Sequence, residues 1–178
     1  MPVRIYNYFK GGSIDSLRYI KRRLVLGCCN ILCFSPSFKP SQDIKTLLLR
    51  LLANSLGENV KFSEHLFILY GKNFSIGKDS AIGTHCKIYD FYPIKIGCNL
   101  LASHGLTLIS ATHEPNNYES RPGPITIGDN VWLGINVTIV GPVRIGNNAV
   151  VGAGSLVIRD IPDNAIAAGV PAKVIRYK

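Results

Sequence analysis

Charged residues and long apolar runs are both scarce in this sequence, and each shortage excludes a class of protein. Only 17% of the residues are charged and 47% are hydrophobic, which argues against a disordered chain and provides material for a core. The longest apolar run, residues 24–34, has 11 positions, whereas about 20 apolar residues are needed to cross a bilayer. Because Lys21, Arg22 and Arg23 precede it, we expect a packed or membrane-surface helix rather than a signal peptide.

The cysteines form neither a disulfide framework nor a zinc pattern. Their number is odd, and Cys28, Cys29 and Cys33 are crowded into six positions. Paired C-x-x-C motifs are lacking. We therefore expect reduced thiols, a cytoplasmic location and no bound metal.

The positive charge is concentrated in the first third of the chain. The net charge is +9, and residues 1–61 hold ten Lys and Arg against three Asp and Glu, whereas residues 62–178 hold ten against eight. Such a segment either contacts an anionic partner, such as lipid or a phosphorylated substrate, or is simply solvated. No nucleic-acid-binding motif accompanies the charge, so we expect no nucleic acid partner.

The same N-terminal third is predicted to be mostly helical. A cap at residues 13–16 favours a helix over residues 17–32, and Pro36 and Pro40 are expected to end it. A second apolar stripe at residues 44–52 predicts another helix that ends near Gly57. These helices either cover one end of the following domain or bind a membrane surface.

A spacing of six residues dominates the chain from about residue 59 onward. An aliphatic residue, often followed by Gly, recurs at this interval from Ile76, with two residues inserted before Ile96. A second apolar or small residue follows four positions after each such marker in the C-terminal part. In that part the markers are Ile127, Leu133, Ile139, Ile145, Val151 and Val157, and the second positions are Val131, Val137, Val143, Ala149, Ser155 and Ile161.

A period of six with two inward positions predicts a triangular coil. Each hexad forms one flat side and one corner, so three hexads complete a turn of 18 residues. Asn and Asp suit the corners, where left-handed backbone conformations are common. One coil cannot bury its interior alone, so successive coils stack as parallel strands. The sequence therefore predicts an all-β domain over residues 59–178, after a helical segment over residues 1–58.

These hexads resemble the hexapeptide-repeat transferase family over about residues 59–176. The resemblance implies a left-handed parallel β-helix, which is an exception to the right-handed rule for parallel crossovers. Residues 111–114 (ATHE), residues 124–134 and the closing residues 162–176 are similar to sugar O-acetyltransferases. The likeness extends to the galactoside/maltose group and, more closely, to the capsule, colanic-acid and O-antigen enzymes.

The hexads are interrupted once. They stop after Leu108 and resume at Ile127, a step of 19 residues that is one more than a full coil. We therefore expect residues 110–124 to take the place of one coil as a polar, Pro-rich excursion loop. Loops on rigid scaffolds commonly carry function, and His113 is the residue in this loop that can act as a base near neutral pH.

Acyl transfer from a thioester to an alcohol needs a base, donors for the oxyanion and a slot that holds both substrates. His113 meets the first need. In the enzymes that this chain resembles, the matching histidine is the catalytic base. Glu114 stands where many members of the polysaccharide branch carry Asp, so we expect it to assist catalysis by orienting the imidazole.

The resemblance also implies acetyl-CoA as co-substrate, held in the cleft between neighbouring coil stacks of a homotrimer. Packing or solvation is the alternative role of each residue involved. By resemblance, Trp132 flanks the cleft, Ile135 supplies the backbone amide for the oxyanion, Ala153 and Gly154 bond the pantetheine arm, Ile158 and Arg159 match a Thr-Lys pair, and Arg176 meets the nucleotide phosphates.

The acceptor side has fewer matches. Asp90, before Phe91 and Tyr92, matches a region that contacts acceptor sugars in some members. Gly83 stands where the galactoside/maltose group has an acceptor-binding Asn, and that group's usual leading domain is also missing. Both departures argue against an enzyme for simple free sugars.

The sequence thus predicts an acetyl-CoA-dependent O-acetyltransferase for a sugar hydroxyl in surface-polysaccharide biosynthesis, at the cytoplasmic face of the membrane. Peripheral membrane contact is expected through the N-terminal segment. The alternatives are a serine or antibiotic O-acetyltransferase, a zinc enzyme like the β-helical carbonic anhydrases, and a non-catalytic scaffold. The zinc alternative depends on His85 and His104, which are 19 residues apart and form no close pair.

Overall fold

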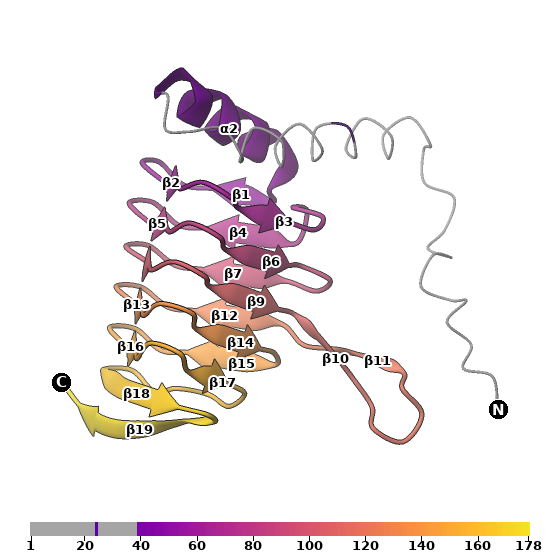
Figure 1. Ribbon diagram of the computed structural model, residues 1–178, viewed down its shortest axis with the longest axis vertical. Helices are drawn as coiled ribbons and strands as arrows, with labels where there is room; N and C mark the ends of the chain where they lie inside the picture. The colour runs from indigo at the N-terminus through magenta and orange to yellow at the C-terminus, as the bar shows by residue number, and fades with distance from the viewer. Residues whose placement is uncertain (1–23, 25–38) are drawn as a thin grey trace.

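The computed structural model describes residue 24 and residues 39–178 (Figure 1). The helix expected over residues 17–32 lies outside these residues, apart from Leu24, which is helical and exposed. The apolar run over residues 24–34 and the basic residues before it also lie outside the described part, except for Leu24.

A helix, α2 (Lys39–Leu52), covers the N-terminal end of the coil stack (Figure 1). Leu49 and Leu52 are buried against the stack, whereas Leu47 and Leu51 face outward. Pro40 lies within the first turn of α2, where no hydrogen bond is needed from the N–H that proline lacks. The helix that Pro36 and Pro40 were predicted to end lies outside the described residues. The helix ends at Leu52, before the predicted Gly57, because β1 already pairs with the next coil.

In the described chain, three sheets form the sides of a triangular prism, and their strands run parallel except for the final strand of one sheet. Side A holds β1 (Ser55–Leu56), β4 (Phe74–Ile76), β7 (Ile94–Ile96), β12 (Ile125–Ile127) and β15 (Val143–Ile145). Side B holds β2 (Lys61–Phe62), β5 (Ala81–Ile82), β8 (Leu101–Ala102), β13 (Trp132–Leu133), β16 (Val150–Val151), β18 (Ala165–Gly169) and β19 (Ala172–Tyr177). Side C holds β3 (Phe67–Ile68), β6 (Lys87–Tyr89), β9 (Thr107–Ile109), β14 (Thr138–Val140) and β17 (Leu156–Val157).

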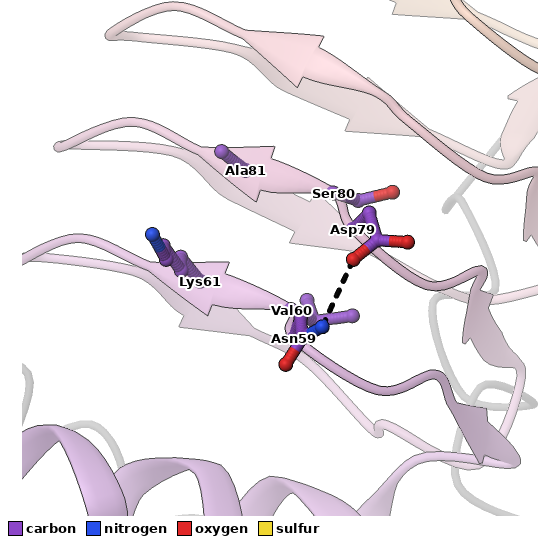
Figure 2. Close-up of a pocket in the computed structure, with 6 residues that line it drawn as sticks. All are labelled: Asn59, Val60, Lys61, Asp79, Ser80 and Ala81. Carbon is purple, nitrogen blue, oxygen red and sulfur yellow. Dashed lines mark hydrogen bonds between the residues drawn. The ribbon is translucent and has the colours of Figure 1, made fainter.

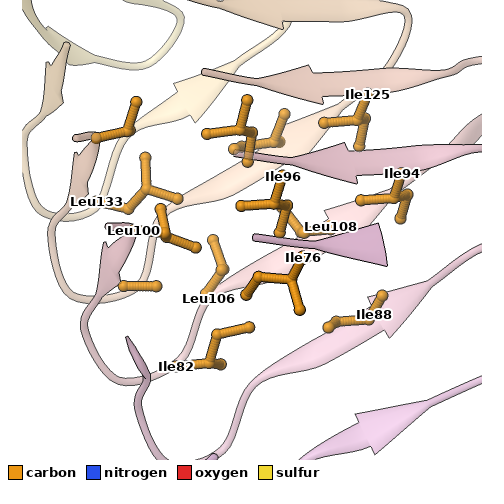
Figure 3. Close-up of a cluster of buried hydrophobic side chains, with 14 of the residues drawn as sticks. Ile76, Ile82, Ile88, Ile94, Ile96, Leu100, Leu106, Leu108, Ile125 and Leu133 are labelled. Carbon is orange, nitrogen blue, oxygen red and sulfur yellow. The ribbon is translucent and has the colours of Figure 1, made fainter. Parts of the chain in front are cut away.

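The interior of the prism confirms the hexad interpretation. Every marker and every second position named from the sequence is buried. Side chains from the three sides converge on the prism axis, as Figure 3 shows for Ile82, Leu108 and Leu133 among others. Each fully buried Ile or Leu stabilises the fold by about 1.5–3 kcal/mol relative to exposure. Buried aliphatic contacts between coils therefore hold the stack together along its whole length.

Asn and Asp occupy the corners between sides A and B, as predicted. Their backbone φ angles are positive, for example 55° at Asn130 and 58° at Asn148. The side-chain amides also bond from coil to coil. Asn130 Nδ2 donates to Asn148 Oδ1 at 3.2 Å, and Asn148 Nδ2 donates to Asn164 Oδ1 at 3.0 Å.

The coil period changes along the chain, and the change lies at the corner between side C and the next side A, the CA corner. Paired residues are 20 apart for Phe74 and Ile94, 18 apart for Ile125 and Val143, and 31 apart across the interruption. β9 therefore leads to β12 on the adjoining side, and no coil is missing. The prediction that residues 110–124 replace a coil is wrong, because spacing alone does not distinguish a lost coil from a corner insertion.

Candidate active site

The inserted residues form a β-hairpin that projects from the CA corner (Figure 1). β10 (Ala111–His113) pairs antiparallel with β11 (Ser120–Pro122), and Gly123 N–H donates to the carbonyl oxygen of Ser110 at 3.0 Å to close the neck. Ser110 is buried, and its hydroxyl accepts from Tyr92 N–H at 2.9 Å. The hairpin is thus anchored to the coil stack at its base.

His113 ends β10 and is exposed, directly across the hairpin from Ser120. The neighbouring Glu114 carboxylate is bound by Arg121, with Nη1 2.7 Å from Oε2. Glu114 also ties the hairpin through its backbone N–H, which donates to the carbonyl of Glu119 at 2.9 Å. Glu114 therefore shapes the hairpin that carries His113, and its carboxylate binds Arg121 rather than the imidazole.

Two residues predicted to bind the cofactor lie in one row on the outer face of side B. Trp132 is 51% exposed, and its partner on the next strand is Val150. The row continues through Ile166 to Arg176 on β19. Three strand spacings separate Trp132 from Arg176, or about 14 Å. A cofactor laid across the strands from Trp132 would thus approach a cationic side chain at the C-terminal end of the prism.

Three further predicted residues lie at the corner between sides B and C, the BC corner. Ile135 and Gly154 are on successive coils, and Gly154 N–H donates to the carbonyl of Ile135 at 2.8 Å. Gly154 has a φ of +68°, and the space that a Cβ would occupy there is open. Within residues 39–178, the N–H groups of Ile135 and Ala153 have no hydrogen-bond acceptor. These amides are therefore available to a ligand, as oxyanion and pantetheine donors must be.

The remaining predicted residues lie at the other edge of side C. Ile158, which is 46% exposed, and Arg159 follow β17 at the CA corner, the same corner from which the His113 hairpin departs. The predicted base and the predicted oxyanion donor thus stand at opposite edges of one side of the prism.

Asp90 is not placed to contact an acceptor. It is 0% exposed, and its two carboxylate oxygens accept from Tyr70 N–H at 2.7 Å and Asn73 N–H at 3.2 Å. Burial raises the pKa of this carboxyl, and the backbone N–H donors oppose that effect. The acceptor role predicted for Asp90 is corrected to a structural one, in which it fixes the CA corner of the preceding coil.

The other histidines line the BC corner. The rings of His65 and His85 are stacked, with centroids 4.4 Å apart and planes within 5°. His104 Nδ1 lies 3.0 Å from the backbone nitrogen and 2.8 Å from the hydroxyl of Thr84. His65 was not singled out from the sequence, although its distance of 20 residues from His85 is the local coil period.

No group of three or more metal-ligating side chains occurs in the described part of the chain. None of the described helices has the length and apolar character to cross a membrane.

A shallow hollow of about 450 Å³ lies beside the Asn59–Asp79 hydrogen bond on the first two coils (Figure 2). None of the predicted site residues lines it.

Comparisons with known proteins agree with this geometry. The family described as bacterial transferase hexapeptide (six repeats) matches residues 124–159. Galactoside O-acetyltransferase of Escherichia coli K12 is 39% identical over 149 residues, which cover 80% of this chain and 73% of that protein. A putative acetyltransferase of Staphylococcus aureus Mu50 is 36% identical over 82% of this chain and 76% of its own length.

Solved structures extend the likeness to bound cofactor. A galactoside acetyltransferase in complex with coenzyme A superposes with a TM-score of 0.82 at 33% identity, over 94% of this chain and 84% of that one. A hexapeptide-repeat acetyltransferase from Vibrio cholerae, complexed with acetyl coenzyme A, has a TM-score of 0.82 at 27% identity over 94% and 92% of the two chains. The predicted fold class, a left-handed parallel β-helix, is confirmed.

Proposed function

Since the chain belongs to the hexapeptide-repeat acetyltransferases, we propose that it transfers the acetyl group of acetyl-CoA to a sugar hydroxyl in surface-polysaccharide biosynthesis. The observation that carries the proposal is the anchored hairpin, which holds an exposed His113 away from the prism. Free amides at Ile135 and Ala153, and the row from Trp132 to Arg176, support a site for the donor.

The proposed reaction is a direct transfer. His113 takes the proton from the acceptor hydroxyl as its oxygen attacks the thioester carbonyl. The N–H of Ile135 stabilises the oxyanion of the tetrahedral intermediate. When the intermediate collapses, the carbon–sulfur bond breaks, and His113 returns the proton to the leaving thiolate. The products are the acetyl ester and free CoA.

We propose a cyclic homotrimer, in which the hairpin of one copy reaches the BC corner of the next. The outward residues of the three sides support this arrangement. Those of side A are polar, whereas sides B and C present apolar columns that a second copy would cover. The polar residues of side A are Ser75, Lys95, Thr126 and Arg144. The apolar residues are Leu101, Trp132 and Val150 on side B, and Ile109, Val140 and Ile158 at the edge of side C.

Contact with the inner face of the cytoplasmic membrane is proposed for the N-terminal part. Leu47 and Leu51, one turn apart on α2, are 60% and 69% exposed, and the cationic Arg50 beside them is also exposed. An apolar face with flanking cations suits an anionic lipid surface. A lipid-linked acceptor would be presented at that surface.

The test is acetyl transfer by His113→Ala. Loss of the base is expected to lower kcat/KM by about 10²- to 10⁴-fold, while binding of CoA in a thermal-shift assay stays unchanged. Release of the CoA thiol is measured with lipid-linked oligosaccharides, galactosides, maltose, serine and antibiotics as acceptors. Transfer near the wild-type rate by the variant would exclude the mechanism, and a wild type that prefers serine or an antibiotic would exclude the proposed substrate class.

A further inference from the structure

The BC corner continues past the predicted oxyanion position toward the N-terminal end of the prism. Thr84, His104, Ile135 and Ala153 occupy the same corner position on successive coils, about 4.8 Å apart. The residues assigned to the pantetheine and phosphates all lie on the C-terminal side of Ile135. The leaving group therefore extends in that direction, and the acceptor must approach the thioester from the side of His104.

The structure fixes the tautomer of His104. The backbone N–H of Thr84 can only donate, and it points at Nδ1 at 3.0 Å, so Nδ1 is the acceptor and carries no proton. The Thr84 hydroxyl lies 2.8 Å from the same Nδ1 and can donate a second hydrogen bond to it. In the neutral ring the proton then resides on Nε2. His104 is exposed, so an oriented N–H donor is presented to solvent one coil from Ile135.

Gly83, next to Thr84, adds no side chain to this corner. A Cβ at Gly83 would lie within 2.7 Å of the backbone of Ser103, so that position provides only main chain. The pair formed by Thr84 and His104 is exposed, and an exposed hydrogen bond contributes little to stability. Its geometry is therefore better explained by a ligand than by the fold.

We propose that Thr84 and His104 form a subsite for the acceptor sugar, in which Nε2–H of His104 donates to a sugar oxygen near the attacking hydroxyl. This inference rests on the proposed function and adds the group that positions the acceptor. The ligand class is a neutral or anionic sugar with a hydroxyl or ring oxygen beside the acetylated position. The role is one of positioning, because the proton removed in the reaction goes to His113.

The experiment compares His104→Leu with His104→Gln on the full chain, with the best sugar acceptor of the wild type. The Leu variant is expected to raise the KM for the sugar about tenfold, as for loss of one hydrogen bond that orients substrate. The KM for acetyl-CoA and the thermal midpoint should not change. The Gln variant keeps an N–H donor and should recover part of the loss. His85→Leu, at the same corner one coil earlier, is the matched control and should leave both KM values unchanged.

The outcomes separate this subsite from the proposed function. An unchanged KM for the sugar in His104→Leu, with an active wild type, would overturn the subsite and leave sugar acetylation standing. A rise in the KM for acetyl-CoA, or an equal effect of His85→Leu, would also overturn it, because the contact would then be with the donor or with the corner as a whole. A wild type that acetylates no sugar would overturn the proposed function, and the subsite with it.

Discussion

Two buried polar residues, Asp90 and Ser110, have the same structural role on successive coils. Each is the first residue after a strand of side C, and each accepts backbone N–H groups of the corner that precedes it. Because buried N–H donors are costly when unpaired, these side chains hold the CA corner from which the hairpin departs. Side chains that hold the corner thus control the position of His113 without contacting it.

Asp90→Asn should therefore destabilise the protein by about 1–3 kcal/mol, since an amide nitrogen would face one of the two N–H donors. Burial raises the pKa of the Asp90 carboxyl, so the native state binds a proton more readily than the unfolded state. The free energy of unfolding should consequently fall as pH rises from the ordinary carboxyl pKa through the raised one, and this slope should disappear in Asp90→Asn. Urea unfolding at several pH values measures both effects.

Asp160→Asn is the matched control for that experiment. Asp160 also accepts a backbone N–H, from Arg144 at 2.7 Å, but it is exposed. Its loss should cost less than about 1 kcal/mol. Equal costs for the two variants would contradict the argument that burial makes Asp90 important.

At the scale of elements, α2 and the β10–β11 hairpin project beyond a prism that is otherwise regular. The hairpin is joined to the stack by its neck, and α2 is held by Leu49 and Leu52. Each thus has one surface fixed by the core and another left free. The free surface of the hairpin carries His113, and that of α2 carries Leu47 and Leu51.

Replacing Leu47 and Leu51 together by Glu should weaken binding to anionic vesicles about tenfold or more, because two apolar contacts are lost and like charge is added. Cosedimentation with phosphatidylglycerol-containing and pure phosphatidylcholine vesicles measures this. Val170→Glu introduces one glutamate at the C-terminal end, where Val170 is 70% exposed, and should bind as the wild type does. Undiminished binding by the double variant would rule out α2 as the membrane-contacting face.

At the scale of the whole molecule, the groups proposed for catalysis are divided between the two edges of side C. His113 leaves from the CA corner, whereas Ile135 and Gly154 lie at the BC corner. Parallel prisms around a three-fold axis would join these edges at three equivalent sites. Such an arrangement would also place all three α2 helices at the same end of the assembly.

Shared sites predict complementation between inactive variants. Trp132→Ala is expected to impair the donor site and His113→Ala to remove the base. Coexpressed with different tags and purified as mixed trimers, the two should regain about one third of the wild-type activity, because one of the three junctions in each mixed trimer joins an intact hairpin to an intact donor site. Neither variant alone should be active, and mixed assemblies without activity would show that each site is built within one chain.

The sequence by itself determined the interior of this protein and its chemistry. The six-residue spacing decides which side chains point inward, since this depends only on neighbours along the chain, and it predicted the buried positions from Ile76 to Ile161. The resemblance of residues 111–114 and 124–134 identified the family, and it led to the prediction that His113 is the base. The helix end predicted near Gly57 was less accurate, because the pairing of β1 with β4 decides it.

Only the tertiary structure decided what lies beside what at the corners. Neighbours there are 18, 20 or 31 residues apart, and an insertion changes that number without a local signal. For this reason the sequence wrongly predicted that the hairpin replaces a coil and that Asp90 contacts the acceptor. It also did not predict the pairing of Thr84 with His104. The same stacking placed the His113 hairpin and Ile135 at opposite edges of side C, because the strands of that side lie between the two corners.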